Sequence, residues 1–176
     1  MFTLRCTQKL LARLGATPDP QPALADTVLG DWYANLIRVG RLQLVLAVSE
    51  TTLLPVVVPA REGRTLATRI RHALEPLLLS IGIPPEEVLA ELDAMSCATI
   101  SKTASRRVLG SLNDLAFQLE VGLANHPERS LLEHALGLSG TPLSLIDHGS
   151  PGSATVAAFA TARELRRIRS LARTGL

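Results

Sequence analysis

The sequence predicts an α+β fold, in which a mainly antiparallel sheet of about four or five strands packs with helices, followed by a C-terminal helical extension. Short β-rich stretches occur singly or as a meander between helical stretches, without the regular strand–helix alternation of a parallel sheet. Of the 176 residues, 47% are hydrophobic and only 3% are aromatic. We therefore expect one domain with a core of leucine, valine, isoleucine and alanine, together with an appendage.

The N-terminal segment should supply the first strand. FTLRCT (residues 2–7) alternates as a strand does, and Thr7 is positioned to cap a short helix over residues 8–14. Three prolines predict a loop over residues 15–26.

Three further strands are expected, over residues 32–39, 43–50 and 53–59. Gly40 and Arg41 join the first two in a manner typical of a tight hairpin. The apolar residues of the second of these strands are continuous rather than alternating. Such a strand is typically covered on both faces, so we expect helices on one side of it and further structure on the other.

The rest of the chain is mainly helical. Leucines at helical spacing predict a helix over residues 65–83, which Pro76 should kink or divide. A helix over residues 84–95 starts with prolines and acids, and a last strand follows over residues 96–103. Further helices are expected over residues 105–124, 129–138 and 154–173, with a loop over residues 139–153.

These elements suggest four parts. They are an α+β core domain (1–124), a short helical extension (125–148), a linker (149–153) and a basic amphipathic helix (154–176). The last part carries five arginines and one glutamate, a local charge of +4. The whole chain carries +2, so the first three parts together carry −2. The basic character of this protein therefore belongs to its C-terminal helix.

Composition limits the chemistry. Cys6 and Cys97 are too few for a disulfide framework or a zinc site, and we expect each to act as a small apolar residue in a strand. The four histidines lack the spacing of a metal-binding helix, so no metal and no cofactor are expected. No apolar run approaches the roughly 20 residues of a membrane helix. Without a recognisable signal peptide, a cytoplasmic location is expected.

The longest expected helix carries an unusual polar stripe. Ser105 is a good N-cap, and Arg106 then lies in the first turn, where a cation is unfavourable by roughly 0.3–1 kcal/mol. Arg106, Gly110 and Asn113 lie together opposite the leucines. A glycine inside a helix costs about 1 kcal/mol relative to alanine, unless a ligand or another backbone approaches there.

Two hypotheses explain this stripe. Lys102 and Thr103 precede the cap, so cations, hydroxyls and free helix-end amides meet at one corner, as an anion site requires. The structural alternative is that Arg106 pairs with an acid elsewhere and Gly110 lets a neighbouring strand pack closely.

Three motifs in the chain resemble an uncharacterised prokaryotic family of domains of unknown function, number 6933. They are CTQKLLARL, DWYANLI and SKTASRRVLGSLND, and the resemblance covers approximately residues 2–122. It implies no activity, but it implies that these positions are typical of the family: Lys9, Trp32, Asn35, Thr103, Arg106, Gly110 and Asn113. A single Trp at a strand start is typically a core anchor. Asn35, unusual in a strand, should bond a loop or face a pocket.

The C-terminal helix is amphipathic. Leu165, Ile168, Leu171 and Ala172 form one face. The candidate partner contacts cover most of the other face: Arg163, Arg166, Arg167, Arg169 and Arg173. Such a helix typically packs on a protein domain, binds an anionic membrane surface or binds the phosphates of a nucleic acid. Its small apolar face lacks Trp or Phe near the arginines and disfavours a membrane, so docking on a neighbouring subunit is favoured, ahead of nucleic acid.

The sequence thus favours a non-catalytic interaction or regulatory domain that binds a protein or nucleic-acid partner, or forms a homo-oligomer, through the arginine-rich helix. The alternative is a small enzyme acting on a phosphorylated or otherwise anionic substrate at the Lys102–Arg106 corner. No phosphate-binding loop, dinucleotide motif or nucleophile elbow is present. Asp147 and His148 have no spacing that ties them to Ser101, so no catalytic residue is assigned.

Overall fold

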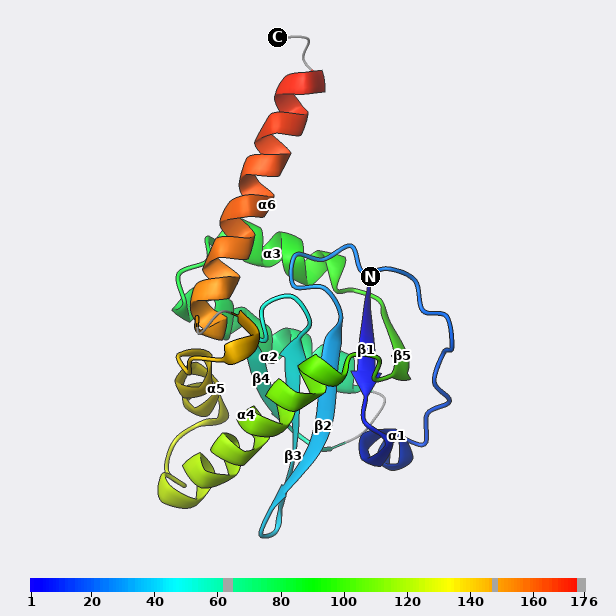
Figure 1. Ribbon diagram of the computed structural model, residues 1–176, viewed down its shortest axis with the longest axis vertical. Helices are drawn as coiled ribbons and strands as arrows, with labels where there is room; N and C mark the ends of the chain where they lie inside the picture. The colour runs from blue at the N-terminus through cyan, green and yellow to red at the C-terminus, as the bar shows by residue number, and fades with distance from the viewer. Residues whose placement is uncertain (62–64, 147–148, 174–176) are drawn as a thin grey trace.

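The computed structural model describes residues 1–61, 65–146 and 149–173 of the chain. Its elements follow the predicted order (Figure 1). The strands are β1 (Phe2–Cys6), β2 (Trp32–Val39), β3 (Leu42–Ser49), β4 (Pro55–Pro59) and β5 (Ala98–Lys102). The helices are α1 (Gln8–Leu14), α2 (Leu66–Ser80), α3 (Pro85–Ala94), α4 (Arg106–Asn125), α5 (Leu131–Ser139), the short 3₁₀ helix η2 (Ser144–Ile146) and α6 (Pro151–Arg173).

The five strands form one sheet in the order β4-β3-β2-β1-β5. β2 and β3 form the predicted hairpin, which turns at Gly40 with a φ of 56°, a conformation that glycine adopts without a Cβ clash. β3 also pairs antiparallel with β4, whereas β1 pairs in parallel with both β2 and β5. The α+β class and the mainly antiparallel sheet are confirmed. The parallel pairs at β1 were not predicted, because the residue pattern of a five-residue strand does not indicate whether its neighbours run parallel or antiparallel to it.

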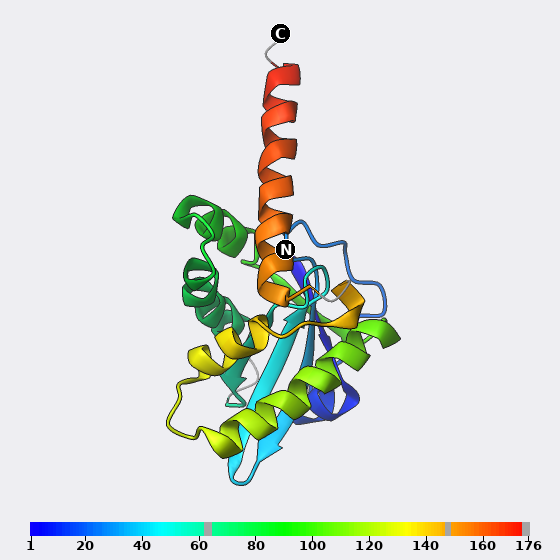
Figure 2. The ribbon, with the colours of Figure 1, turned by 60° about the vertical axis from the view of Figure 1, so that its left-hand side comes forward.

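Helices cover both faces of the sheet. α4 crosses one face over β2 and β3, while α2 and α3 lie on the other side (Figures 1 and 2). β3 is buried from Leu44 to Ser49, as its unbroken apolar run predicts. α5 packs against β4, α2 and α4.

Three local predictions differ from the structure. Pro76 does not divide the predicted helix but lies inside α2, where the leucines on both sides of it are buried in the core. Cys97 is exposed in the turn before β5, and only Cys6 is a buried strand residue, whose burial raises the pKa of its thiol to about 12. Thr7 occupies the N-cap position of α1 without capping it, since its hydroxyl donates to Asn35 Oδ1 at 2.9 Å.

The base of α6 is part of the body. The helix begins at Pro151, inside the segment expected as a linker. Thr155 and Phe159 are 0% and 1% exposed, and the Thr155 hydroxyl lies 2.8 Å from that of Thr52, between β3 and β4. Beyond this base α6 projects away from the body (Figures 1 and 2). Residues 164–173 are called the arm below.

Candidate functional site

The arm carries an apolar stripe in solvent. Leu165, Ile168 and Leu171 are 51%, 52% and 49% exposed. They recur every three residues and therefore lie along one side of the helix. Most helical stability in proteins comes from the packing of an apolar face, and a short free helix is marginal in water. The arm therefore has the character of a helix that packs on another surface.

The arginines nearest the body lie beside acidic residues of α3. Arg163 Nε donates to the Glu87 carboxylate of α3 at 2.6 Å, and the Glu87 side chain is only 9% exposed. Arg166 borders a hollow of about 200 Å³ together with Glu87 and Glu91. The buried Glu91 carboxylate accepts two backbone N–H groups from the loop before β2, and its burial raises its pKa.

The arginines nearer the tip point into solvent. Arg167 Nη1 lies 3.9 Å from a Glu164 oxygen, an exposed pair that contributes little to stability. Arg169 is exposed and forms no ion pair with any residue that the structure describes. The Arg173 side chain lies outside the described part. Arg167 and Arg169 are thus free to meet a partner.

The predicted anion corner is partly assembled by the sheet. β5 and β1 end side by side, with Lys102 opposite Cys6. The residues that follow, Thr103 and Thr7, therefore leave the sheet at the same point. The Thr7 hydroxyl donates to Asn35 Oδ1 of β2. Of the two predicted alternatives for Asn35, the structure therefore shows the loop contact, made with the residue before α1.

A hollow of about 430 Å³ lies at this corner, beneath the proline-rich loop. Arg5, Lys102, Thr103 and Asp19 are among its lining residues, so two cations, a hydroxyl and one carboxylate border the same space. The loop is fixed to β5 on its outer side, because the Ser101 hydroxyl donates to the Asp19 carbonyl at 2.7 Å. Of the predicted residues, Lys102 and Thr103 line the hollow, and Arg5 was not among the predicted residues.

Four of the predicted residues lie elsewhere. Lys9 is exposed on α1, and Arg106 and Asn113 are exposed on α4, outside the lining of the hollow. Arg106 forms no ion pair with a described residue, so the structural alternative of an acidic partner is not seen either. Trp32 is fully buried in the core, and its Nε1 has no hydrogen-bond partner within the described ranges.

A buried polar network beside the hollow was missed. Arg5 Nε and Nη2 lie 2.9 Å and 2.8 Å from Asp31 Oδ2, while the Thr3 N–H donates to Oδ1 at 2.9 Å. The Tyr33 hydroxyl accepts the Ser105 N–H at 3.1 Å, and burial raises the pKa of this tyrosine. An arginine within an apolar strand and an aspartate directly before the next strand were the signals that could have revealed this network.

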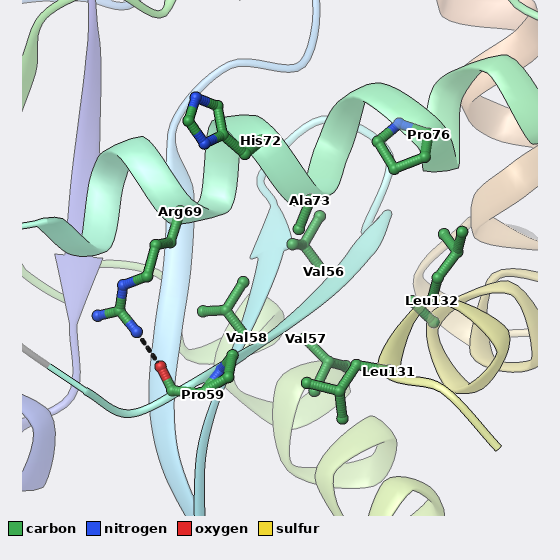
Figure 3. A pocket seen from close by; sticks show the side chains of 11 residues that line it. Val56, Val57, Val58, Pro59, Arg69, His72, Ala73, Pro76, Leu131 and Leu132 are labelled. Atoms are coloured by element: carbon green, nitrogen blue, oxygen red, sulfur yellow. Dashed lines mark hydrogen bonds between the residues drawn. The ribbon is translucent and has the colours of Figure 1, made fainter.

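The free edge of β4 borders an apolar hollow of about 320 Å³ between α2 and α5 (Figure 3). The register directs the backbone groups of Pro55, Val57 and Pro59 away from β3. Proline has no N–H, and the Pro59 carbonyl already accepts from Arg69, so an added strand would find one free N–H at Val57. The edge is therefore protected against strand addition.

Metal and membrane sites are not found in the described ranges. No group of three or more His, Cys, Asp or Glu side chains there is arranged to hold a metal ion. No described helix combines the length and apolarity needed to cross a bilayer. The hydroxyl of Ser101 is engaged by the loop, and Asp147 and His148 lie outside the described residues.

The relationship of the chain to known families follows from comparison. The family DUF6933, a domain of unknown function, matches residues 3–154. The chain belongs to this family. None of the curated proteins matches it. The DUF6933 match extends beyond residue 122, where the predicted resemblance ended, so α5 and the start of α6 belong to the family domain. The arm lies outside the matched residues.

Proposed function

We propose that this DUF6933 protein is a non-catalytic interaction module whose arm binds a protein partner. The observation that carries the proposal is the half-exposed stripe of Leu165, Ile168 and Leu171 on a helix that projects from the body. An amphipathic helix laid against an apolar groove is a common mode of protein recognition. Arginines beside such a stripe favour a partner with an acidic surface and raise the rate constant of association with it.

A protein partner is favoured over nucleic acid by the composition of the arm. Its arginines alternate with leucine and isoleucine, and binding to phosphates would leave those apolar residues in water. The arm also contains no aromatic side chain on which a base could stack. We further propose a cytoplasmic location, because Cys6 and Cys97 are both free thiols.

Photo-crosslinking from the arm tests this proposal. With a photoreactive side chain at Ile168, 52% exposed, we expect discrete protein adducts in a cell extract. The same group at Leu42, 55% exposed in β3 beside the hairpin turn, is the matched control and should yield none of them. A chain ending at Arg163 retains Phe159 and the Glu87 contact and should lose at least about 90% of partner capture, equivalent to a tenfold or greater loss of affinity. Adducts to nucleic acid alone, or equal adducts from both positions, would overturn the protein-binding proposal.

A second candidate is an enzyme or receptor for anionic ligands at the β1–β5 corner, favoured by the hollow that Arg5 and Lys102 line. Titration with inorganic phosphate, followed by amide chemical shifts, should move the signals of Thr103 and its neighbours. Lys102→Ala should raise the dissociation constant about tenfold, as expected for one charge-assisted contact. Lys9→Ala, which removes an exposed lysine outside the hollow, should leave it unchanged. Equal effects of the two substitutions would exclude the hollow as the site.

A further inference from the structure

The outer face of α4 is a second surface with exposed apolar side chains. We define it as Gly110, Asp114, Phe117 and Val121, whose spacing of four, three and four residues places them on one side of the helix. Phe117 is 68% exposed and Val121 is 42% exposed. The other two phenylalanines of the chain are buried. Exposed aromatic side chains are enriched as anchors of protein interfaces.

Neither the backbone conformation at Gly110 nor the packing around it within the described residues requires a glycine. Its φ is not positive, and a Cβ added there would meet no atom of the described residues within 4 Å. The predicted close packing of a neighbouring strand is therefore wrong. A glycine within a helix is unfavourable, and it permits close approach of another backbone. At Gly110 such a backbone can come only from outside the described body.

The surface beside Phe117 is hollowed. A hollow of about 610 Å³ lies between α4 and the segment Pro142–Ser144, with Asp114 on its rim. Glu120 lies exposed on the same helix. An apolar side chain entering here would contact Phe117 and Leu143, while the two acids would face cations beside it.

The arm complements this surface in shape and charge. The arm presents an apolar stripe with arginines beside it. On α4 the acids Asp114 and Glu120 lie beside Phe117 and Val121, while the exposed Arg106 and Arg107 lie more than two turns away at the N-terminal end of the helix. The arm is held away from α4 of its own chain, because Thr155 and Phe159 are buried and Arg163 bonds Glu87 (Figures 1 and 2). Pairing of two arms is disfavoured, since both carry net positive charge.

We infer that the arm of one molecule packs across the outer face of α4 of a second copy of the same chain. This inference rests on the proposed function and names the partner. The arm residues that face Phe117 and Val121 are Leu165, Ile168 and Leu171. Every copy carries both an arm and a receiving face, so two copies can exchange arms around a two-fold axis and make two equal contacts. The glycine at Gly110 allows the two helix backbones to approach closely.

Analytical ultracentrifugation of the full chain, over about 1–100 µM, measures the dimer directly. Phe117→Ser should raise the dissociation constant at least about tenfold, because a central aromatic anchor is lost. Leu42→Ser removes a comparably exposed apolar side chain far from α4's outer face and should leave the constant unchanged. Circular dichroism should be the same for both variants, since neither side chain is buried.

A charge exchange separates docking from a structural effect. Asp114→Arg with Glu120→Arg should weaken the dimer, and so should Arg167→Glu with Arg169→Glu. All four substitutions in one chain should restore it, because the attraction is then reversed in sign at both surfaces. A merely structural role of these residues would not produce this recovery.

The outcomes distinguish the inference from the proposed function. A monomer at every concentration, or a dimer indifferent to Phe117→Ser and to the charge exchange, would overturn the inference. If crosslinks from Ile168 then lead to a different protein, the proposed function stands without it. If neither a dimer nor an Ile168 adduct forms, both fail.

Discussion

Replacing Phe159 with alanine is expected to lower the free energy of unfolding by about 3–5 kcal/mol. The ring is 1% exposed at the base of α6, where it packs with the hydrophobic core. Its removal loses the transfer free energy of the ring and leaves a cavity that the surrounding helices fill only in part. Urea denaturation followed by circular dichroism measures the change. Proteolysis should also cut α6 faster, because the arm loses its principal anchor.

Leu42→Ala is the control, since this apolar side chain is 55% exposed and lies outside the proposed contact between copies. It should change the free energy of unfolding by no more than about 0.5 kcal/mol, as is usual for surface substitutions. Equal, small effects at both positions would mean that the base of α6 is not part of the cooperative core. The arm would then have no fixed direction, and the inference about exchanged arms would lose its support.

Replacing Asp31 with alanine should destabilise the protein by about 3–5 kcal/mol. Its carboxylate accepts from Arg5 Nε, Arg5 Nη2 and the Thr3 N–H, and the Arg5 side chain is only 19% exposed. Without Asp31 the guanidinium is left largely buried without its counter-charge, and the Thr3 N–H loses its acceptor. Thermal and urea unfolding of the variant measure the loss.

Two comparisons identify the cause. Asp26→Ala removes an aspartate that is 67% exposed and pairs with the N-terminal amino group, so it should destabilise the protein much less than Asp31→Ala does. Arg5→Met combined with Asp31→Ala should cost less than the sum of the single changes, because the second change removes the unpaired charge left by the first. An additive double variant would contradict the ion-pair account.

Local chemistry made much of the fold predictable. The leucine spacing of α4 and its cap at Ser105, which accepts the Val108 N–H at 3.3 Å, follow from interactions within a few residues along the chain. The hairpin at Gly40 and the doubly covered β3 likewise depend on local turn chemistry and on apolar patterning. The separation of an apolar from a basic face on the C-terminal helix needs only its periodicity.

The sequence by itself therefore determined the types and order of the elements, the α+β class and the amphipathic character of the arm. Only the tertiary structure decided that β1 lies in parallel between β2 and β5, that Arg5 pairs with Asp31 and that Phe159 anchors α6. It also decided that Gly110 faces open space. Each of these depends on how residues far apart in the chain are placed, and propensity and periodicity describe only neighbours a few residues apart.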